Sequence, residues 1–133
     1  MLAPKQAIIL AGGRGVRLGE MAGGRPKPLV DVGGRPFLDT IFENLADQGI
    51  ERAVLLCGYR ADQIVDHYES RSFAGISLEF IIESEPLGTG GALLNAFEQL
   101  DAAFVMINGD TLFSVDIGGL SAIFSEDMGA DVV

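Results

Sequence analysis

The stretch that decides the fold is AIILAGGRGVRLGEMAGGRPKPL, residues 7–29. Its first five residues are apolar without interruption, a pattern typical of a strand that is buried on both faces of a parallel sheet. A loop with six glycines and four basic residues follows directly. The stretch therefore predicts a buried first strand whose carboxyl end opens into a glycine-rich, positively charged loop.

Strand and helix patterns alternate along the rest of the chain. Further strands are expected at residues 53–57, 76–82 and 104–107, with a short extended piece at 29–32 and the start of another strand at 130–133. Helices are expected from Pro36 to a cap at Gly49, and at residues 61–68, 90–100 and 117–124. This alternation predicts an α/β fold, Rossmann-like, with a mostly parallel sheet flanked by helices.

The bulk properties bound the class of protein. With 133 residues and 48% hydrophobic residues, the chain can form one domain with a substantial core. No apolar run is long enough to span a membrane, and the single cysteine, Cys57, favours a reducing compartment, the cytoplasm. A pI near 4.3 argues against nucleic-acid binding. Because the chain stops within an apolar segment, we expect residues 1–133 to be a C-terminally truncated portion of a longer domain.

The charge of the chain is distributed unevenly. Residues 14–35 contain five basic and two acidic side chains, a balance of +3, so the remaining residues must sum to −13 to give the net charge of −10. A basic island in an acidic chain favours a small, highly anionic ligand. Successive amides of Gly12, Gly13 and Gly15 can form a concave anion site at the end of the first strand.

The spacing of the loop differs from two common phosphate loops. A P-loop requires Gly-Lys-Ser/Thr, but Lys27 lies between Pro26 and Pro28, and a dinucleotide fingerprint requires a third glycine where this chain has Leu18. The two prolines fix the backbone on both sides of Lys27. This restraint is typical of a lysine whose ammonium group must be aimed at a ligand.

Four motifs of the chain resemble those of a known family. LAGGRGVRL (10–18), PKPL (26–29), EPLGTGGAL (85–93) and NGD (108–110) match, in order, four motifs of the sugar-phosphate nucleotidyltransferases. Val16 stands where that family usually has threonine. The resemblance extends over essentially the whole chain, and it implies that residues 1–133 are the nucleotide-binding portion of a nucleotidyltransferase catalytic domain.

The resemblance also implies a reaction and its residues. A sugar 1-phosphate attacks the α-phosphorus of a nucleoside triphosphate and releases pyrophosphate, with Mg²⁺ as cofactor. Arg17 is expected to hold the β- and γ-phosphates, Lys27 to neutralise the reacting phosphates, and Asp110 to bind Mg²⁺, unless Asp110 is a turn aspartate. These are the expected catalytic residues. The expected nucleotide-binding residues are Leu10, Ala11, Gly12, Gly13, Gly15, Arg17, Lys27, Glu83, Gly88 and Thr89.

The identity of the base is inferred from Glu83. Pyrimidine-using relatives commonly have glutamine there, whereas a carboxylate accepts at both oxygens and matches the N1–H and amino donors of guanine. Glu83 therefore favours GTP, with Glu85 as a competing candidate and an exposed strand-end glutamate as the alternative. Overall likeness is greatest to guanylyltransferases that use heptose or mannose 1-phosphates.

Two other functions remain open on the sequence. A transferase that uses UTP or dTTP would differ mainly at Glu83. A nucleotide-binding regulatory module without catalysis would fit Val16, but it would not need both Lys27 and Asp110. Cys57 and His67 have no evident catalytic partners, so we expect a core cysteine and a solvated histidine. The sequence leaves the oligomeric state open, a homo-oligomer included.

Overall fold

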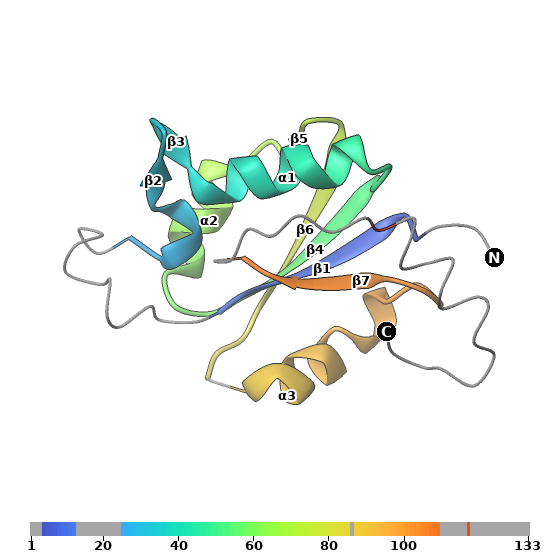
Figure 1. Cartoon of the computed structure of the whole chain (residues 1–133). Helices are drawn as coiled ribbons and strands as arrows, with labels where there is room; N and C mark the ends of the chain where they lie inside the picture. The colour runs from blue at the N-terminus through green and yellow to red at the C-terminus, as the bar shows by residue number, and fades with distance from the viewer. Residues whose placement is uncertain (1–3, 13–24, 86, 110–116, 118–133) are drawn as a thin grey trace.

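The fold is built on a five-stranded sheet with helices on both faces (Figure 1). The computed structural model describes residues 4–12, 25–85, 87–109 and 117. Within these, the sheet order is β5-β6-β4-β1-β7. The strands are β1 (Gln6–Ala11), β4 (Arg52–Cys57), β5 (Ser72–Phe73), β6 (Ile76–Ile82) and β7 (Val105–Asn108).

The sheet is parallel except at one edge. Strand β1 pairs in parallel with both β4 and β7, and β4 pairs in parallel with β6, whereas β5 is antiparallel to β6. The predicted α/β class with a mostly parallel, Rossmann-like sheet is confirmed. The short strand β5 follows Arg71, whose positive φ of 54° turns the chain before the hairpin. This strand is not among those expected from the sequence pattern.

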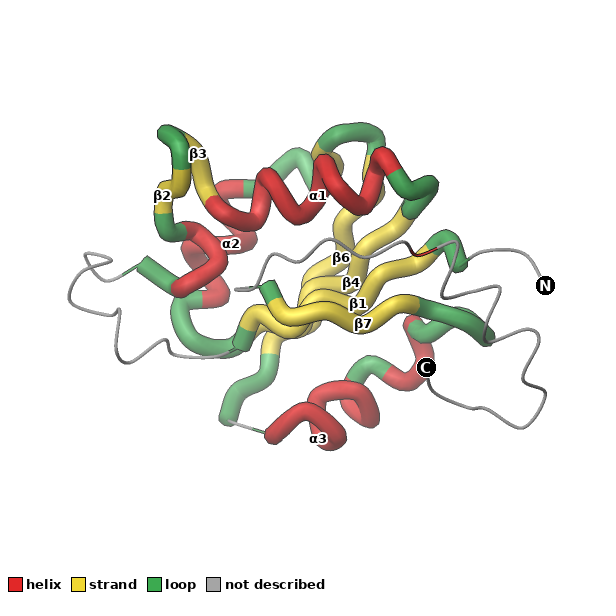
Figure 2. The backbone as a smooth tube through the Cα atoms, in the orientation of Figure 1, coloured by secondary structure: helices red, strands yellow, loops and turns green. Residues whose placement is uncertain are grey.

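The two faces of β1 contribute to two separate cores. Ala7, Ile9 and Ala11 belong to the core formed with α1 (Phe37–Asp47) and α2 (Ala61–His67). Ile8 lies in a second core with Ala92 and Ala96, from α3 (Gly88–Asn95) and its end. Figure 2 shows α1 and α2 on one side of the sheet and α3 on the other. Burial on both faces explains why the run 7–11 is apolar throughout.

The end of α1 follows the expected cap. Gly49 has φ +89°, the Gly49 N–H donates to the Ala46 carbonyl, and the Ile50 N–H donates to the Leu45 carbonyl. This pattern is a Schellman motif, in which buried Ile50 and Leu45 add the usual apolar contact.

Two helical predictions need correction. Pro36 does not lie in the first turn of α1: it ends a small hairpin of β2 (Asp31–Val32) and β3 (Arg35–Pro36) with ψ 141°, and the helix begins one residue later. The helix expected at 90–100 instead begins at Gly88 and ends at Asn95. A 3₁₀ turn, Phe97–Gln99, follows, because Ala96 leaves helical geometry.

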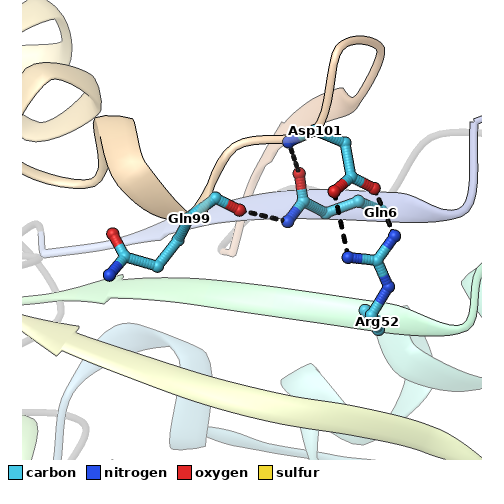
Figure 3. Close-up of polar contacts among 4 residues, drawn as sticks. All are labelled: Gln6, Arg52, Gln99 and Asp101. Atoms are coloured by element: carbon cyan, nitrogen blue, oxygen red, sulfur yellow. Dashed lines mark hydrogen bonds and ion pairs between the residues drawn. The ribbon is translucent and has the colours of Figure 1, made fainter.

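A polar cluster fixes the connection from α3 to β7 at the amino end of the sheet (Figure 3). The side chain of Gln6, 2% exposed, donates to the Gln99 carbonyl at 2.7 Å and accepts from the Asp101 N–H at 2.8 Å. Arg52 forms a two-pronged ion pair with the Asp101 carboxylate. The amide of Gln6 thus satisfies two backbone groups of the crossover.

The last third of the sequence is only partly described. Ile117 is buried in the core beside α1, and its N–H donates to Gln48 Oε1 at 2.7 Å. The rest of the helix expected at 117–124 and the strand expected at 130–133 lie outside the described residues. No helix in the described part of the chain is both long and apolar enough to span a membrane.

Candidate functional site

The candidate site lies at the carboxyl edge of the sheet, at the left of Figure 1. The chain moves from β1 outward to β4 and β6, then returns through α3 to β7 on the other side of β1. The winding direction therefore reverses between β1 and β7. Ligands of open α/β sheets bind outside the carboxyl ends of the strands at such a switch point.

Backbone hydrogen bonds continue beyond the paired strands and hold these ends together. The Gly109 N–H, directly after β7, donates to the Leu10 carbonyl at 2.9 Å, and the Glu83 N–H, directly after β6, donates to the Cys57 carbonyl at 2.8 Å. The Tyr59 N–H reaches the Gly12 carbonyl at 3.5 Å. The residues after all four parallel strands are thereby brought side by side, although they are far apart in the sequence.

Glu83 places a carboxylate at the centre of this edge. If Gly12 or Gly58 carried a side chain, its Cβ atom would lie only 2.9 Å from Glu83 Oε1. The carboxylate of Glu83 therefore packs directly against the backbone of both glycines. The side chain of Glu83 is half-buried, and within the described residues its carboxylate has no ion pair or hydrogen bond. It offers only acceptors. A half-buried carboxylate of this kind is suited to a ligand that presents N–H donors.

The surroundings of Glu83 also explain the state of Cys57. Burial, and secondly the negative charge of Glu83, raise the pKa of the Cys57 thiol to about 12. The side chain is 0% exposed. Cys57 is therefore a protonated core residue, as predicted, and not a nucleophile. His67 is exposed and lies edge-to-face on Tyr68, in agreement with the prediction of a solvated histidine.

Lys27 lies on a 3₁₀ turn whose backbone is fixed at both ends. Residues Lys27–Leu29 form this turn; the Leu29 N–H donates to the Pro26 carbonyl, and Pro26 and Pro28 are buried. A Cβ built on Gly109 would lie 3.5 Å from Pro28 Cγ. The proline-flanked lysine is therefore carried next to the end of β7. The restraint on Lys27 agrees with the expectation from its flanking prolines. Of the extended piece expected at 29–32, only Asp31–Val32 is a strand, because Leu29 ends the 3₁₀ turn.

The other expected site residues divide into two groups. Leu10 and Ala11 end β1, Gly88 begins α3 with φ +71°, and Thr89 lies in its first turn. Ala11 is 2% exposed and its methyl group belongs to the core beside α1 and α2. Four expected residues lie outside the described part of the chain: Gly13, Gly15, Arg17 and Asp110.

Two further arginines of the basic island, Arg25 and Arg35, are paired with acids. Arg14 lies outside the described residues. Arg25 lies 3.4 Å from Asp31, and Arg35 forms a two-pronged pair with Glu43 at 2.5 and 2.6 Å. The pairing raises the pKa of Arg35 and lowers that of Glu43. Arg25 and Arg35 therefore pair with neighbouring carboxylates and not with groups at the strand ends.

Comparison with known proteins gives the family. Residues 6–130 match the Nucleotidyl transferase family. The chain belongs to this family. It is 45% identical over 113 residues to D-glycero-alpha-D-manno-heptose 1-phosphate guanylyltransferase of Aneurinibacillus thermoaerophilus, a match that covers 84% of this chain and 49% of that protein. It is 33% identical over 122 residues to UTP–glucose-1-phosphate uridylyltransferase AglF of Haloferax volcanii, covering 92% and 50%.

A solved structure supports the same placement. HddC from Yersinia pseudotuberculosis complexed with GMP-PN superposes with a TM-score of 0.81 at 43% identity, covering 90% of this chain and 54% of that one. The chain spans about half the length of the curated relatives named here. The fold of this nucleotidyl transferase chain is therefore that of the family, over the portion it shares.

Gly58 is the residue of this site that sequence reasoning missed. It follows a buried strand in the segment LLCGY, as Gly12 and Gly109 follow theirs. That shared position, a glycine directly after a parallel strand, was the available signal, because the carboxyl ends of parallel strands share one edge. The sequence does not indicate that the side chain packed against Gly58 is that of Glu83.

The described residues contain no group of three His, Cys, Asp or Glu side chains that could hold a metal. Asp110 directly follows Gly109, which is buried against β1 at the switch point. Mg²⁺ commonly takes one or two protein carboxylates and completes its shell with phosphate oxygens and water. A single carboxylate after β7 is therefore compatible with Mg²⁺ held jointly by protein and nucleotide.

Proposed function

We propose that the protein is a guanylyltransferase that transfers GMP from GTP to a sugar 1-phosphate of the heptose or mannose type. The observation that carries the proposal is the half-buried, acceptor-only carboxylate of Glu83 at the switch point of a nucleotidyl transferase fold. Guanine presents two adjacent donors, N1–H and the amino group, which two carboxylate oxygens can accept together. Glu85 is exposed to solvent, which favours Glu83 over Glu85 as the base reader.

The proposed chemistry is a single in-line displacement. A phosphate oxygen of the sugar 1-phosphate attacks the α-phosphorus of GTP; a new P–O bond forms, and the bond from the α-phosphorus to the bridging oxygen breaks. The electron pair leaves with pyrophosphate. Such a transfer depends on positioning and charge neutralisation and needs no protein nucleophile, which agrees with a buried, protonated Cys57.

The roles of the charged residues follow from this step. The amides of Gly12, Gly13 and Gly15 are proposed to hold the phosphates, Arg17 the departing pyrophosphate, and Lys27 the charge at the reacting phosphorus. Asp110 is the proposed Mg²⁺ ligand, and Mg²⁺ would supply further neutralisation of the phosphate oxygens. Leu10, Ala11, Gly88 and Thr89 are proposed to line the nucleotide through their positions at the strand and helix ends.

A pyrimidine-nucleotide transferase is the second candidate, favoured by the likeness to a uridylyltransferase. The deciding experiment measures kcat/KM for GTP, UTP and dTTP in the full-length protein, each with heptose and mannose 1-phosphates. We expect preference for GTP. A preference for UTP or dTTP overturns the guanylyl proposal, and nucleotide binding without turnover on any sugar 1-phosphate supports a regulatory module instead.

The substitution Glu83→Gln tests the role of the carboxylate. Glutamine replaces one acceptor by a donor, so one guanine donor faces a donor; this mismatch costs about 1–3 kcal/mol, or about ten- to a hundredfold in the GTP:UTP ratio of kcat/KM. Glu85→Gln is the matched control, because Glu85 is exposed and only two residues away. If Glu85→Gln shifts the ratio and Glu83→Gln does not, the base reader is Glu85.

A further inference from the structure

At Gly58 the surrounding atoms, and not the backbone conformation, exclude a side chain. Its φ lies outside the left-handed region, in contrast to Gly33, Gly34, Gly49, Gly75 and Gly88. An alanine at position 58 is therefore conformationally allowed. Yet a built Cβ there would lie 2.9 Å from Glu83 Oε1, 3.2 Å from Glu83 Cγ and 3.3 Å from the Gly12 carbonyl oxygen.

The backbone on both sides of Gly58 is fixed by hydrogen bonds. The Ala61 N–H donates to the Gly58 carbonyl at 3.0 Å at the start of α2, and the Tyr59 N–H contacts the Gly12 carbonyl at 3.5 Å. The preceding residue, Cys57, is paired with both β1 and β6. A Cβ at position 58 therefore cannot escape by moving the backbone at low cost.

The Glu83 side chain is the group that must yield. Its backbone is held, because the Glu83 N–H donates to the Cys57 carbonyl at 2.8 Å, but its carboxylate is the far end of a flexible side chain. Real Cβ atoms essentially never approach a heavy atom within 3.0 Å. An added methyl at Gly58 would therefore turn the carboxylate out of the notch formed by Gly12 and Gly58, while leaving the fold intact.

We infer that Gly58 is a positioning residue for base recognition: by lacking a side chain, it lets the Glu83 carboxylate take the orientation that accepts guanine donors. This inference rests on the proposed function. It also gives Gly12 a second role, because the first glycine of the phosphate loop closes the other side of the same notch. The proposed base reader and the start of the proposed phosphate loop are thus linked, because Glu83 Oε1 packs against both Gly12 and Gly58.

The test is a double-mutant cycle of Gly58→Ala and Glu83→Ala in the full-length protein, with Kd for GTP and UTP as one readout and kcat/KM as another. Gly58→Ala should weaken GTP at least about tenfold relative to UTP. In the Glu83→Ala background, where the side-chain contacts at 2.9 and 3.2 Å are absent, it should change the GTP:UTP ratio by less than about twofold. Thermal unfolding of each variant reports whether the fold is retained.

The outcomes separate the inference from the proposed function. If wild type prefers GTP and Glu83→Ala removes that preference, but Gly58→Ala leaves the ratio unchanged, the positioning role is wrong and the base-reading role stands. If Gly58→Ala weakens GTP and UTP equally, and does so in both backgrounds, Gly58 acts independently of Glu83 and the inference is overturned. If wild type does not prefer GTP, the proposed function fails first and the inference fails with it.

Discussion

Replacing Gln6 by methionine should destabilise the protein by removing two hydrogen bonds at once. Gln6 lies at the start of β1, and its amide joins the Gln99 carbonyl and the Asp101 N–H on the connection that returns the chain to β7 (Figure 3). Methionine has a similar length and shape but neither donates nor accepts effectively. The substitution Gln6→Met therefore keeps the packing and leaves two backbone groups without a partner.

The expected loss follows from the environment of those groups. An unpaired buried donor or acceptor costs about 1–3 kcal/mol. Gln6 itself is 2% exposed, but Gln99 and Asp101 are half-buried, so water can partly replace the lost partners. We therefore take the lower part of that range for each group and expect a total of about 2–3 kcal/mol. This is a large fraction of the stability of an ordinary domain, about 5–15 kcal/mol.

Urea unfolding followed by circular dichroism measures the loss as a shift of the midpoint at constant m-value. Arg52→Ala is the control from the same cluster: its ion pair with Asp101 is far more exposed, with 48% and 33% of the side chains accessible, so we expect at most about 1 kcal/mol. If Arg52→Ala costs as much as Gln6→Met, or if Gln6→Met costs under about 0.5 kcal/mol, the reasoning from buried backbone groups is refuted.

The remaining predictions concern the thiol and the charged groups. Cys57 should resist iodoacetamide at pH 8 in the folded protein and react after unfolding in urea; rapid labelling of native protein would contradict its burial. Folding raises the pKa of the Cys57 thiol from 9.0 to about 12. The contribution of this thiol to the free energy of unfolding is therefore complete below pH 9 and is lost as the pH rises toward 12. Between pH 9 and 12, the free energy of unfolding should fall less in a Cys57→Ala variant than in wild type. Lys27→Ala should lower kcat by about a hundredfold or more, equivalent to about 3 kcal/mol of transition-state stabilisation; Lys5→Ala, an exposed lysine at the amino end of β1, is its control, and equal effects would remove Lys27 from catalysis. Asp110→Asn should abolish most Mg²⁺-dependent turnover, whereas exposed Asp47→Asn should not; a normal rate at ordinary Mg²⁺ would make Asp110 a turn residue.

The sequence by itself determined the four parallel strands, the helix cap at Gly49 and the edge at which chemistry is expected. Local patterns were sufficient, because an uninterrupted apolar run such as 7–11 can only be buried, and a glycine after an apolar stripe, Gly49, can adopt the positive φ that ends a helix. The basic, glycine-rich loop after the first strand and the proline-flanked Lys27 were visible for the same reason: their constraints lie within a few residues of one another.

Only the tertiary structure decided which distant residues meet. Nothing in the segments around Gly12, Gly58 and Glu83 says that one carboxylate oxygen packs against two glycines, because that contact depends on the order β6-β4-β1 and on the register of each pair. The pairing of Gln6 with the connection before β7 is equally invisible, since a glutamine at the start of a strand ordinarily faces solvent. The strands could be recognised one by one from local patterns, but side-by-side placement comes from long-range backbone pairing, which the local sequence does not specify.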